Sequence, residues 1–204
     1  MVLPEGLRLT SPPKRLVVGV TGASGSIYAG RFLSHLRRQD VEVHLVASET
    51  AEQVCRFEGH PLPVAWEPSP ESPARLVRHQ PKDLFAPPSS GSFRHQGMVV
   101  LPCSAGTVGR IASGTSDSLL LRAADVCLKE RRPLVLVVRE TPLSRIHLRN
   151  LLELCDAGAR ILPASPGFYR KPATLDELVD GLLDRVFDQL GWDMDLAPRW
   201  REGS

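Results

Sequence analysis

Short apolar runs alternate with helical patterns along most of the chain. The first run, 15–20, is rich in β-branched residues and ends at a Thr-Gly turn, which is typical of a buried strand. Residues 26–36 then place their apolar side chains on one face of a predicted helix, and 41–47 predicts a second strand. The chain therefore opens as a β-α-β unit.

The same alternation returns in the second half of the chain. Strands are predicted at 98–102, 133–138 and 159–163. Helices are predicted at 118–129 and 144–155, and a last one starts at a capping box formed by Thr174 and Glu177. Strands separated by helices predict one mostly parallel, doubly wound α/β sheet with a helical layer on each face.

Proline breaks this alternation in one segment. Eight of the 18 prolines lie between 61 and 88, just after a predicted helix at 50–58 in which Thr50 and Gln53 have capping-box spacing. This density disfavours a regular helix or a central strand. We expect a single domain over 15–200, preceded by an extension at 1–14 and interrupted by an ordered, Pro-rich excursion at 61–92.

Composition and charge disfavour several classes of protein. A chain of 204 residues can bury one full core, and a net charge of only +2 disfavours a dedicated nucleic-acid binder. No stretch approaches the roughly 18 apolar residues of a membrane span, and the N-terminus lacks a secretory apolar region. The four cysteines form no CxxC pair, so we expect reduced thiols and a cytoplasmic protein.

The ends of the predicted strands carry the candidate chemistry, because doubly wound sheets bind ligands at their carboxyl edge. Small or hydroxyl residues follow three strands, at 21–26, at Ser48 and at 102–107, and each precedes a helix. Such turns either bind a phosphate or serve packing and helix capping. The adjacent Arg139 and Glu140 should point to opposite faces, and a rigid loop at 163–169 should expose Tyr169.

Other polar residues leave alternatives open. Arg122 and Lys129 share one side of a predicted helix at about 10 Å spacing, which suits a solvated face or an anionic pocket. Arg185 borders an apolar helix face and can either extend to solvent or enter a site. The six histidines lack metal-ligand spacing, and Cys103 is favoured as a buried structural thiol over a nucleophile.

Four stretches occur together in an informative order: GVTGASGSIYAGRFL, MVVLPCSAGT, LLLRAADVCLKERRPLVLVVRET and ILPASPGFYRKP. Over about 15–200 they resemble the flavin prenyltransferases, the UbiX-type proteins. The resemblance implies a flavodoxin-like, Rossmann-like three-layer subunit that forms a homododecamer with FMN between subunits. In the Pro-rich excursion only 86–92 resembles the family's substrate loop, while Trp66 and the 67–80 stretch depart from the expected pattern.

The resemblance also implies roles for individual residues, carried over position by position. The implied FMN contacts are Gly22, Ala23, Ser24, Ser48, Ser104, Ala105, Gly106, Thr107 and Arg139. The implied contacts of dimethylallyl phosphate are Ser90, Tyr169 and Arg185, and the implied catalytic residues are Glu58, Arg122, Lys129, Glu140 and Trp200.

The implied reaction joins a dimethylallyl group to N5 and C6 of reduced FMN. Cations and hydroxyls would stabilise the departing phosphate in place of a metal, and the base would be Glu140, Glu58 or the phosphate itself. Prenylated FMN would pass to a UbiD-type decarboxylase in ubiquinone biosynthesis or aromatic acid breakdown. Monophosphate and diphosphate donors stay open, as do two rivals: a flavin-dependent cysteine decarboxylase and a non-catalytic flavin carrier.

Overall fold

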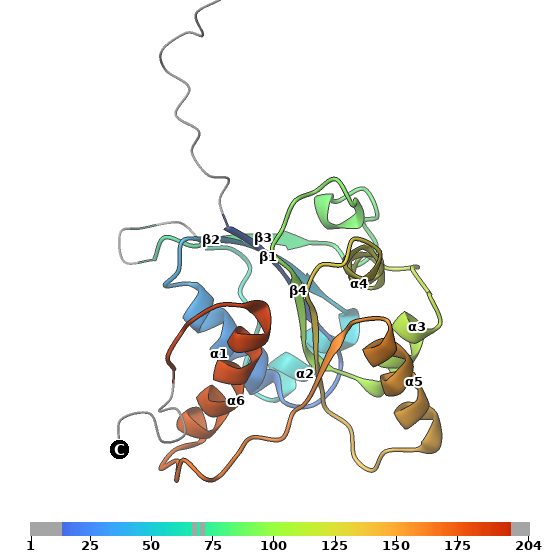
Figure 1. Ribbon diagram of the computed structural model, residues 1–204. Coiled ribbons are helices and arrows are strands. Elements are labelled where there is room, and N and C mark those ends of the chain that lie inside the picture. The colour runs from blue at the N-terminus through green and yellow to red at the C-terminus, as the bar shows by residue number, and fades with distance from the viewer. Residues whose placement is uncertain (1–13, 67–68, 70–71, 197–204) are drawn as a thin grey trace, which may run out of the picture.

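A six-stranded parallel sheet forms the centre of the molecule (Figure 1). The computed structural model describes residues 14–66, 69 and 72–196. The strands are β1 (Lys14–Val20), β2 (Val41–Ala47), β3 (Arg75–His79), β4 (Met98–Cys103), β5 (Leu134–Val138) and β6 (Arg160–Pro163). Their order, β3-β2-β1-β4-β5-β6, reverses direction between β1 and β4. The predicted doubly wound sheet is confirmed, and β1 starts one residue inside the expected extension.

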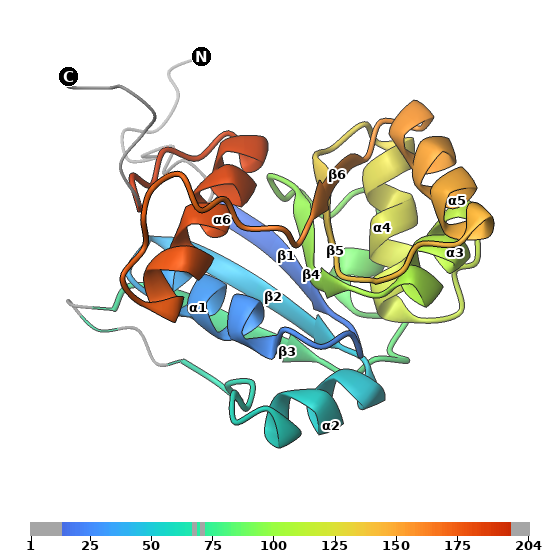
Figure 2. The ribbon, with the colours of Figure 1, turned by 90° about the horizontal axis from the view of Figure 1, so that it is seen from below.

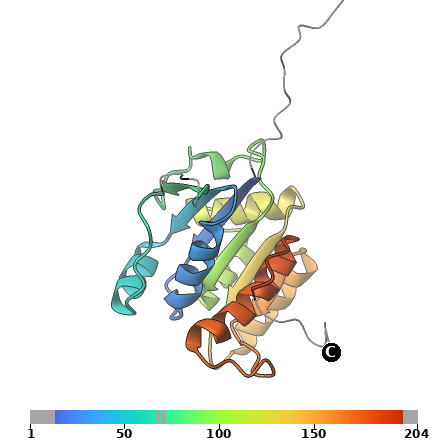
Figure 3. The same cartoon turned by 90° about the vertical axis from the view of Figure 1, so that its left-hand side faces the viewer.

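Helices cover both faces of this sheet, as Figures 2 and 3 show. The helices are α1 (Ser26–Leu36), α2 (Glu49–Phe57), α3 (Ala105–Ala112), α4 (Leu119–Lys129), α5 (Arg145–Asp156) and α6 (Leu175–Leu190). One core lies under α1 and α6, where the rings of Phe32 and Phe187 stack with centroids 4.6 Å apart. A second core lies under α3, α4 and α5. None of the helices in the described ranges is long and apolar enough to cross a membrane.

The central strands are apolar on both sides because both faces of a parallel sheet are covered. All six residues of β4 and the last five of β1 are buried. Each large aliphatic side chain so buried contributes roughly 1.5–3 kcal/mol. The edge strands β3 and β6 are more exposed and have polar residues among their apolar ones.

Hydroxyl side chains begin most of the helices. The N-cap residues that accept a hydrogen bond from a first-turn amide are Ser48, Ser104, Ser118, Ser144 and Thr174. The capping box expected at Thr50 is wrong, because Ser48 caps α2 and Thr50 lies within its first turn. At α6, Thr174 accepts from the Glu177 amide as predicted, but the Glu177 carboxylate accepts from the amide of Ala173 instead.

The Pro-rich excursion contains a strand that the sequence did not reveal. β3 pairs in parallel with β2 at the edge of the sheet, and its flanking prolines, Pro73 and Pro81, end it without interrupting it. From there the chain follows α4, with the amide of Leu119 donating to the carbonyl of Pro81. It reaches the amino edge of the sheet at Gln96, whose amide donates to the carbonyl of Arg15. In the part that the structure describes, the excursion thus contains a strand and packs along α4.

Candidate active site

Three turns meet at the carboxyl edge of the sheet, where the strand order reverses. The buried hydroxyl of Thr21 donates to the carbonyl of Pro102 at 2.8 Å and accepts from the amide of Ser104 at 2.9 Å. A side chain on Gly22 would place its Cβ 2.5 Å from Cγ2 of Thr50, so the first turn lies directly against the start of α2. The turns after β1, β2 and β4 thus form one continuous surface.

Two helices point their amino ends at this surface with hydroxyl caps. Oγ of Ser48 accepts from the amide of Ala51 at 3.1 Å. Oγ of Ser104 accepts from the amide of Thr107 at 3.2 Å and lies 3.0 Å from the Thr107 hydroxyl. A capping hydroxyl keeps its own proton for a ligand, and the helix ends carry partial positive charge. This donor set fits the phosphate of a flavin mononucleotide.

The start of α1 differs from the starts of α2 and α3, because the carboxylate of Glu58 lies there. Oε2 of Glu58 accepts from the amides of Gly25 at 3.0 Å and Ser26 at 2.7 Å. Burial alone would raise the pKa of Glu58, but the polar groups of 24–26, including the amides that donate to its carboxylate, outweigh burial and lower the pKa to about 2. Glu58 is therefore an ionised cap of α1.

The two charged residues after β5 diverge, as strand alternation predicted. Nε of Arg139 donates to the carbonyl of Ser24 at 3.1 Å, which brings its guanidinium over the first turn. Oε1 of Glu140 accepts from the amide of Thr141 at 3.1 Å and so stays in its own loop. The structure thus gathers the expected flavin contacts of the first turn, Ser48, 104–107 and Arg139 at one edge.

A second group of candidates lies along α4. Nε of Arg122 donates to the carbonyl of Ser89 at 3.0 Å, which holds the neighbouring Ser90 beside this helix. A Cβ on Gly91 would lie 2.8 Å from Nζ of Lys129, so the same loop reaches the end of α4. Arg122 pairs with Asp125 at 2.6 Å, and Lys129 pairs with Glu130.

A third group belongs to the far edge of the sheet. Tyr169 is half-exposed in the loop after β6, as predicted, and Gly167 lies close against its ring. Arg185 pairs with Asp188 at 2.6 Å on α6 and lines a pocket of about 470 Å³ between α6 and β6.

The α4 group and the turns at the carboxyl edge stay separate within one chain. Among the described residues, no hydrogen bond or ion pair joins Arg122 or Lys129 to the turns after β1, β2 and β4. Lys129 ends a helix that runs toward the amino edge of the sheet, where the amide of Met98 donates to the carbonyl of Pro133. Trp200, the remaining candidate, lies outside the described residues.

Comparison with known proteins decides the family. The Flavoprotein family model matches residues 7–186. The flavin prenyltransferase UbiX of Deinococcus radiodurans is 49% identical over 192 residues, covering 94% of this chain and 96% of that protein. The chain belongs to the flavin prenyltransferase family. It is therefore a transferase, as the sequence resemblance implied.

Solved structures agree with this membership of the flavin prenyltransferases. AnUbiX (PadA1), determined in complex with FMN and dimethylallyl pyrophosphate, matches with a TM-score of 0.84 and 44% identity over 95% of this chain and all of that one. A dodecameric FMN-dependent UbiX-like decarboxylase from Escherichia coli O157:H7 matches with a TM-score of 0.81 and 43% identity over 92% and 99% of the two chains.

The candidate site contains neither a metal-binding cluster nor a reactive Cys103 thiol in the part of the chain that the structure describes. Among the residues that the structure covers, no group of three or more His, Cys, Asp or Glu side chains could hold a metal ion. Cys103 is fully buried, and burial raises the pKa of its thiol to about 12. It stays a neutral packing residue at physiological pH.

Two residues that shape the candidate site are not evident from the sequence. Thr21 joins two turns, and its only signal was a hydroxyl directly after a buried strand. Arg132 donates to the carbonyls of Gly91 and Phe93 at 2.5 and 2.7 Å and so fixes the Ser90 loop to α4. A run of arginines between a helix and a strand gave no reason to single it out.

Proposed function

We propose that the protein transfers a dimethylallyl group from dimethylallyl monophosphate to N5 and C6 of reduced FMN, without a metal. The observation that supports this most is the pairing of flavin-ready turns with separate cationic groups, in a chain 44% identical to a structure holding FMN and dimethylallyl pyrophosphate. A non-catalytic flavin carrier would need the turns alone. Prenylated FMN would then serve a UbiD-type decarboxylase.

The carboxyl-edge turns would bind the flavin. Ser48, Ser104 and Thr107 can donate hydroxyl protons to its phosphate, and the backbone of the turn from Gly22 to Ser24 would contact the flavin beside them. The guanidinium of Arg139 lies over this turn and would contact the flavin there. When bound, reduced FMN supplies the nucleophilic nitrogen and carbon of the reaction.

The cationic groups would hold the prenyl donor and stabilise its departing phosphate. Arg122, Lys129 and Arg185 each pair with an acidic neighbour one to three residues away. Such exposed pairs contribute about 0–1 kcal/mol, so a phosphate can engage these cations at little cost. The hydroxyls of Ser90 and Tyr169 would complete the contacts, and charge developing on the leaving phosphate would strengthen all of them.

A complete site would require more than one copy of the chain. Different parts of the subunit hold the turns proposed to bind flavin, the α4 group, and the pair Tyr169 and Arg185. We propose a dodecamer like that of the Escherichia coli relative, in which neighbouring copies bring these groups together. Exposed apolar residues on α5, including Ile146 and Leu152, suit burial in such an assembly.

Glu140 is a better base than Glu58. The carboxylate of Glu58 is engaged by the amides of the α1 start, and a pKa of about 2 makes it a poor proton acceptor near neutral pH. The Glu140 carboxylate accepts from one amide of its own loop. We therefore assign proton removal to Glu140 or to the departing phosphate, and a structural role to Glu58.

The cytoplasm is the compartment we propose for this reaction. The substrate flavin must be reduced, and the four cysteines, Cys55, Cys103, Cys127 and Cys155, are all free thiols. Free thiols are typical of reducing compartments.

Anaerobic turnover tests the proposal. The protein is incubated with reduced FMN, dimethylallyl monophosphate and a chelator, and the flavin is analysed by mass spectrometry, with the diphosphate as a second donor. We expect a flavin heavier by one prenyl unit. Lys129→Ala and Glu140→Gln should lose the product while FMN binding persists. Unchanged flavin from the wild-type protein with both donors would contradict the proposal.

A further inference from the structure

We propose that Asp184 is a positioning residue for the donor side of the site, by which we mean Tyr169 and Arg185, the proposed contacts of dimethylallyl phosphate on this edge of the sheet. This inference rests on the proposed function. Asp184 lies on α6 with only 1% of its surface exposed, although it is a carboxylate. Both of its oxygens are engaged, Oδ1 by the backbone amide of Leu196 and Oδ2 by the guanidinium of Arg170. One buried group thus holds two segments that come from different parts of the chain.

The first of these segments carries Tyr169. Nη1 and Nη2 of the neighbouring Arg170 both lie 3.4 Å from Oδ2 of Asp184, and only 12% of the Arg170 side chain is exposed. The guanidinium lies 5.6 Å from the centroid of the Tyr169 ring. Arg170 also crosses α6 at Gly181, where a Cβ would lie 3.7 Å from Nη1. The ion pair between Arg170 and Asp184 therefore fixes where the Tyr169 loop packs against α6.

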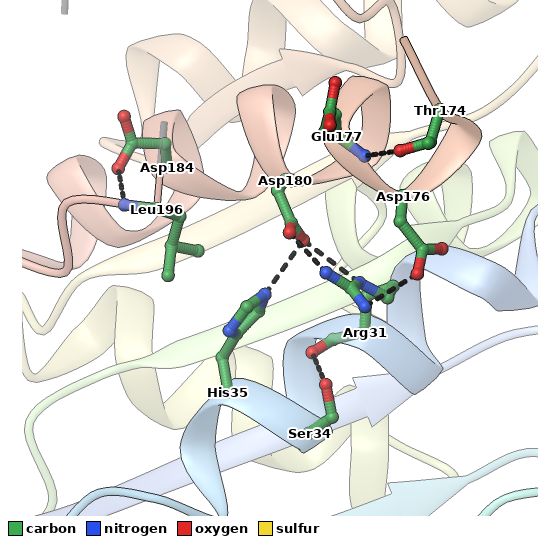
Figure 4. A network of polar contacts seen from close by, with 9 residues as sticks. All are labelled: Arg31, Ser34, His35, Thr174, Asp176, Glu177, Asp180, Asp184 and Leu196. Atoms are coloured by element: carbon green, nitrogen blue, oxygen red, sulfur yellow. Dashed lines mark hydrogen bonds and ion pairs between the residues drawn. The ribbon is translucent and has the colours of Figure 1, made fainter. Parts of the chain in front are cut away.

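The second segment is the stretch that follows α6, at 192–196. α6 ends at Gly191 in a left-handed conformation, with φ of 74°, and the ring of Trp192 stacks on Phe187. The chain then returns along the helix, and the amide of Leu196 donates to Oδ1 of Asp184 at 3.2 Å (Figure 4). Asp184 thus anchors the stretch after α6 to the same helix that holds the Tyr169 loop.

Asp180 provides a matched comparison one turn earlier on the same helix. It is also a buried carboxylate, but it faces α1, where it accepts from Nε of Arg31 at 3.1 Å and lies 2.8 Å from Nε2 of His35 (Figure 4). It has no contact with either segment that Asp184 holds among the interactions of the described chain. Loss of Asp180 would weaken the α1–α6 contact and leave the donor side intact.

The experiment compares Asp184→Asn with Asp180→Asn. Removing the charge of Asp184 leaves the buried Arg170 unpaired and shifts Tyr169. We expect the KM for dimethylallyl monophosphate to rise about tenfold, with a smaller change in kcat and an unchanged Kd for FMN. Asp180→Asn should lower the melting temperature by a similar amount without changing this KM. Arg170→Gln, which removes the other partner, should raise the KM as Asp184→Asn does.

Each outcome has a distinct meaning. An unchanged KM in both Asp184→Asn and Arg170→Gln would overturn the inference, and so would an equal rise in Asp180→Asn, which would show a general loss of stability. If Asp184→Asn does not fold, Arg170→Gln alone decides between these results. Absence of product from the wild-type protein would instead contradict the proposed function.

Discussion

Gly22 is the residue at which the turn after β1 comes closest to α2. Replacing it by alanine would place a Cβ 2.5 Å from Cγ2 of Thr50, closer than real atoms approach, so the turn must move. We expect Gly22→Ala to lose about 1–3 kcal/mol of unfolding free energy and to weaken FMN binding. Urea unfolding and fluorescence titration with FMN measure both effects.

Gly30 supplies the control for this substitution. It lies inside α1, and a methyl group added there would meet nothing closer than Cβ of His60 at 3.8 Å. Gly30→Ala should stay within about 1 kcal/mol of the wild type or exceed it, because alanine favours a helix interior. Equal losses in both variants would show that the contact with Thr50 is unimportant.

Glu58 makes stability depend on pH. The pKa of its carboxyl falls from the ordinary 4.5 to about 2 in the folded protein, so the unfolded chain binds more protons between these values. The stabilisation is full above pH 4.5 and is lost as the pH falls toward 2. We expect Glu58→Gln to cost about 1–2 kcal/mol at pH 7, and the gap to the wild type to shrink at pH 3. Denaturant midpoints at both pH values provide the measurement, and a gap as large at pH 3 as at pH 7 would argue against an ionised cap.

Local residue patterns predicted which residues are candidates better than they predicted the residues to which these candidates form hydrogen bonds. Ser48 and Ser104 follow apolar strands directly, so their position at the carboxyl edge could be read from the sequence. The partner of Glu58 could not, because 33 positions separate it from Gly25 and only the packed fold brings them together. Thr21 was equally hidden, since its bonds reach 81 and 83 positions along the chain.

The turns after β1 and β4 are held together by Thr21, and this pairing of elements positions the flavin surface. Thr21→Val would leave the part-buried Ser104 amide without its partner, while the Pro102 carbonyl would keep only the hydrogen bond from the Thr21 amide at 3.3 Å. We expect a loss of about 1–3 kcal/mol in unfolding free energy and weaker FMN binding. Thr21→Ser keeps the hydroxyl and should retain most of both. A valine variant that binds FMN like the wild type would show that the two turns are placed by other contacts.

Strands and helices with strong apolar patterns were predictable, and β3 was not. Its five residues include two arginines and a histidine and lie among prolines, which resembles irregular chain. The structure explains this because an edge strand needs pairing on one side only, which β2 supplies. The course of the excursion along α4 also depends on long-range bonds from Arg122 and Arg132 that no local pattern encodes.

Within one subunit, the groups that the proposed reaction must bring together lie apart. The flavin turns lie at the carboxyl edge of the sheet, while Lys129 lies at the end of α4 toward the other edge. The family resemblance in the sequence already implied a site between copies, but only the folded subunit reveals which candidates are apart. The proposed site therefore depends on assembly.

Subunit mixing tests whether neighbouring copies share the site. Lys129→Ala and Arg139→Ala chains, each inactive alone, are produced together, and prenylated FMN is measured by mass spectrometry. In an equal mixture, half of the chains have an intact Arg139 and the other half have an intact Lys129. If neighbouring copies share the site, about a quarter of the sites therefore combine an intact Arg139 from one copy with an intact Lys129 from another. We expect product at about that fraction of the wild-type amount. No product from the mixture, beside an active wild type, would contradict a shared site.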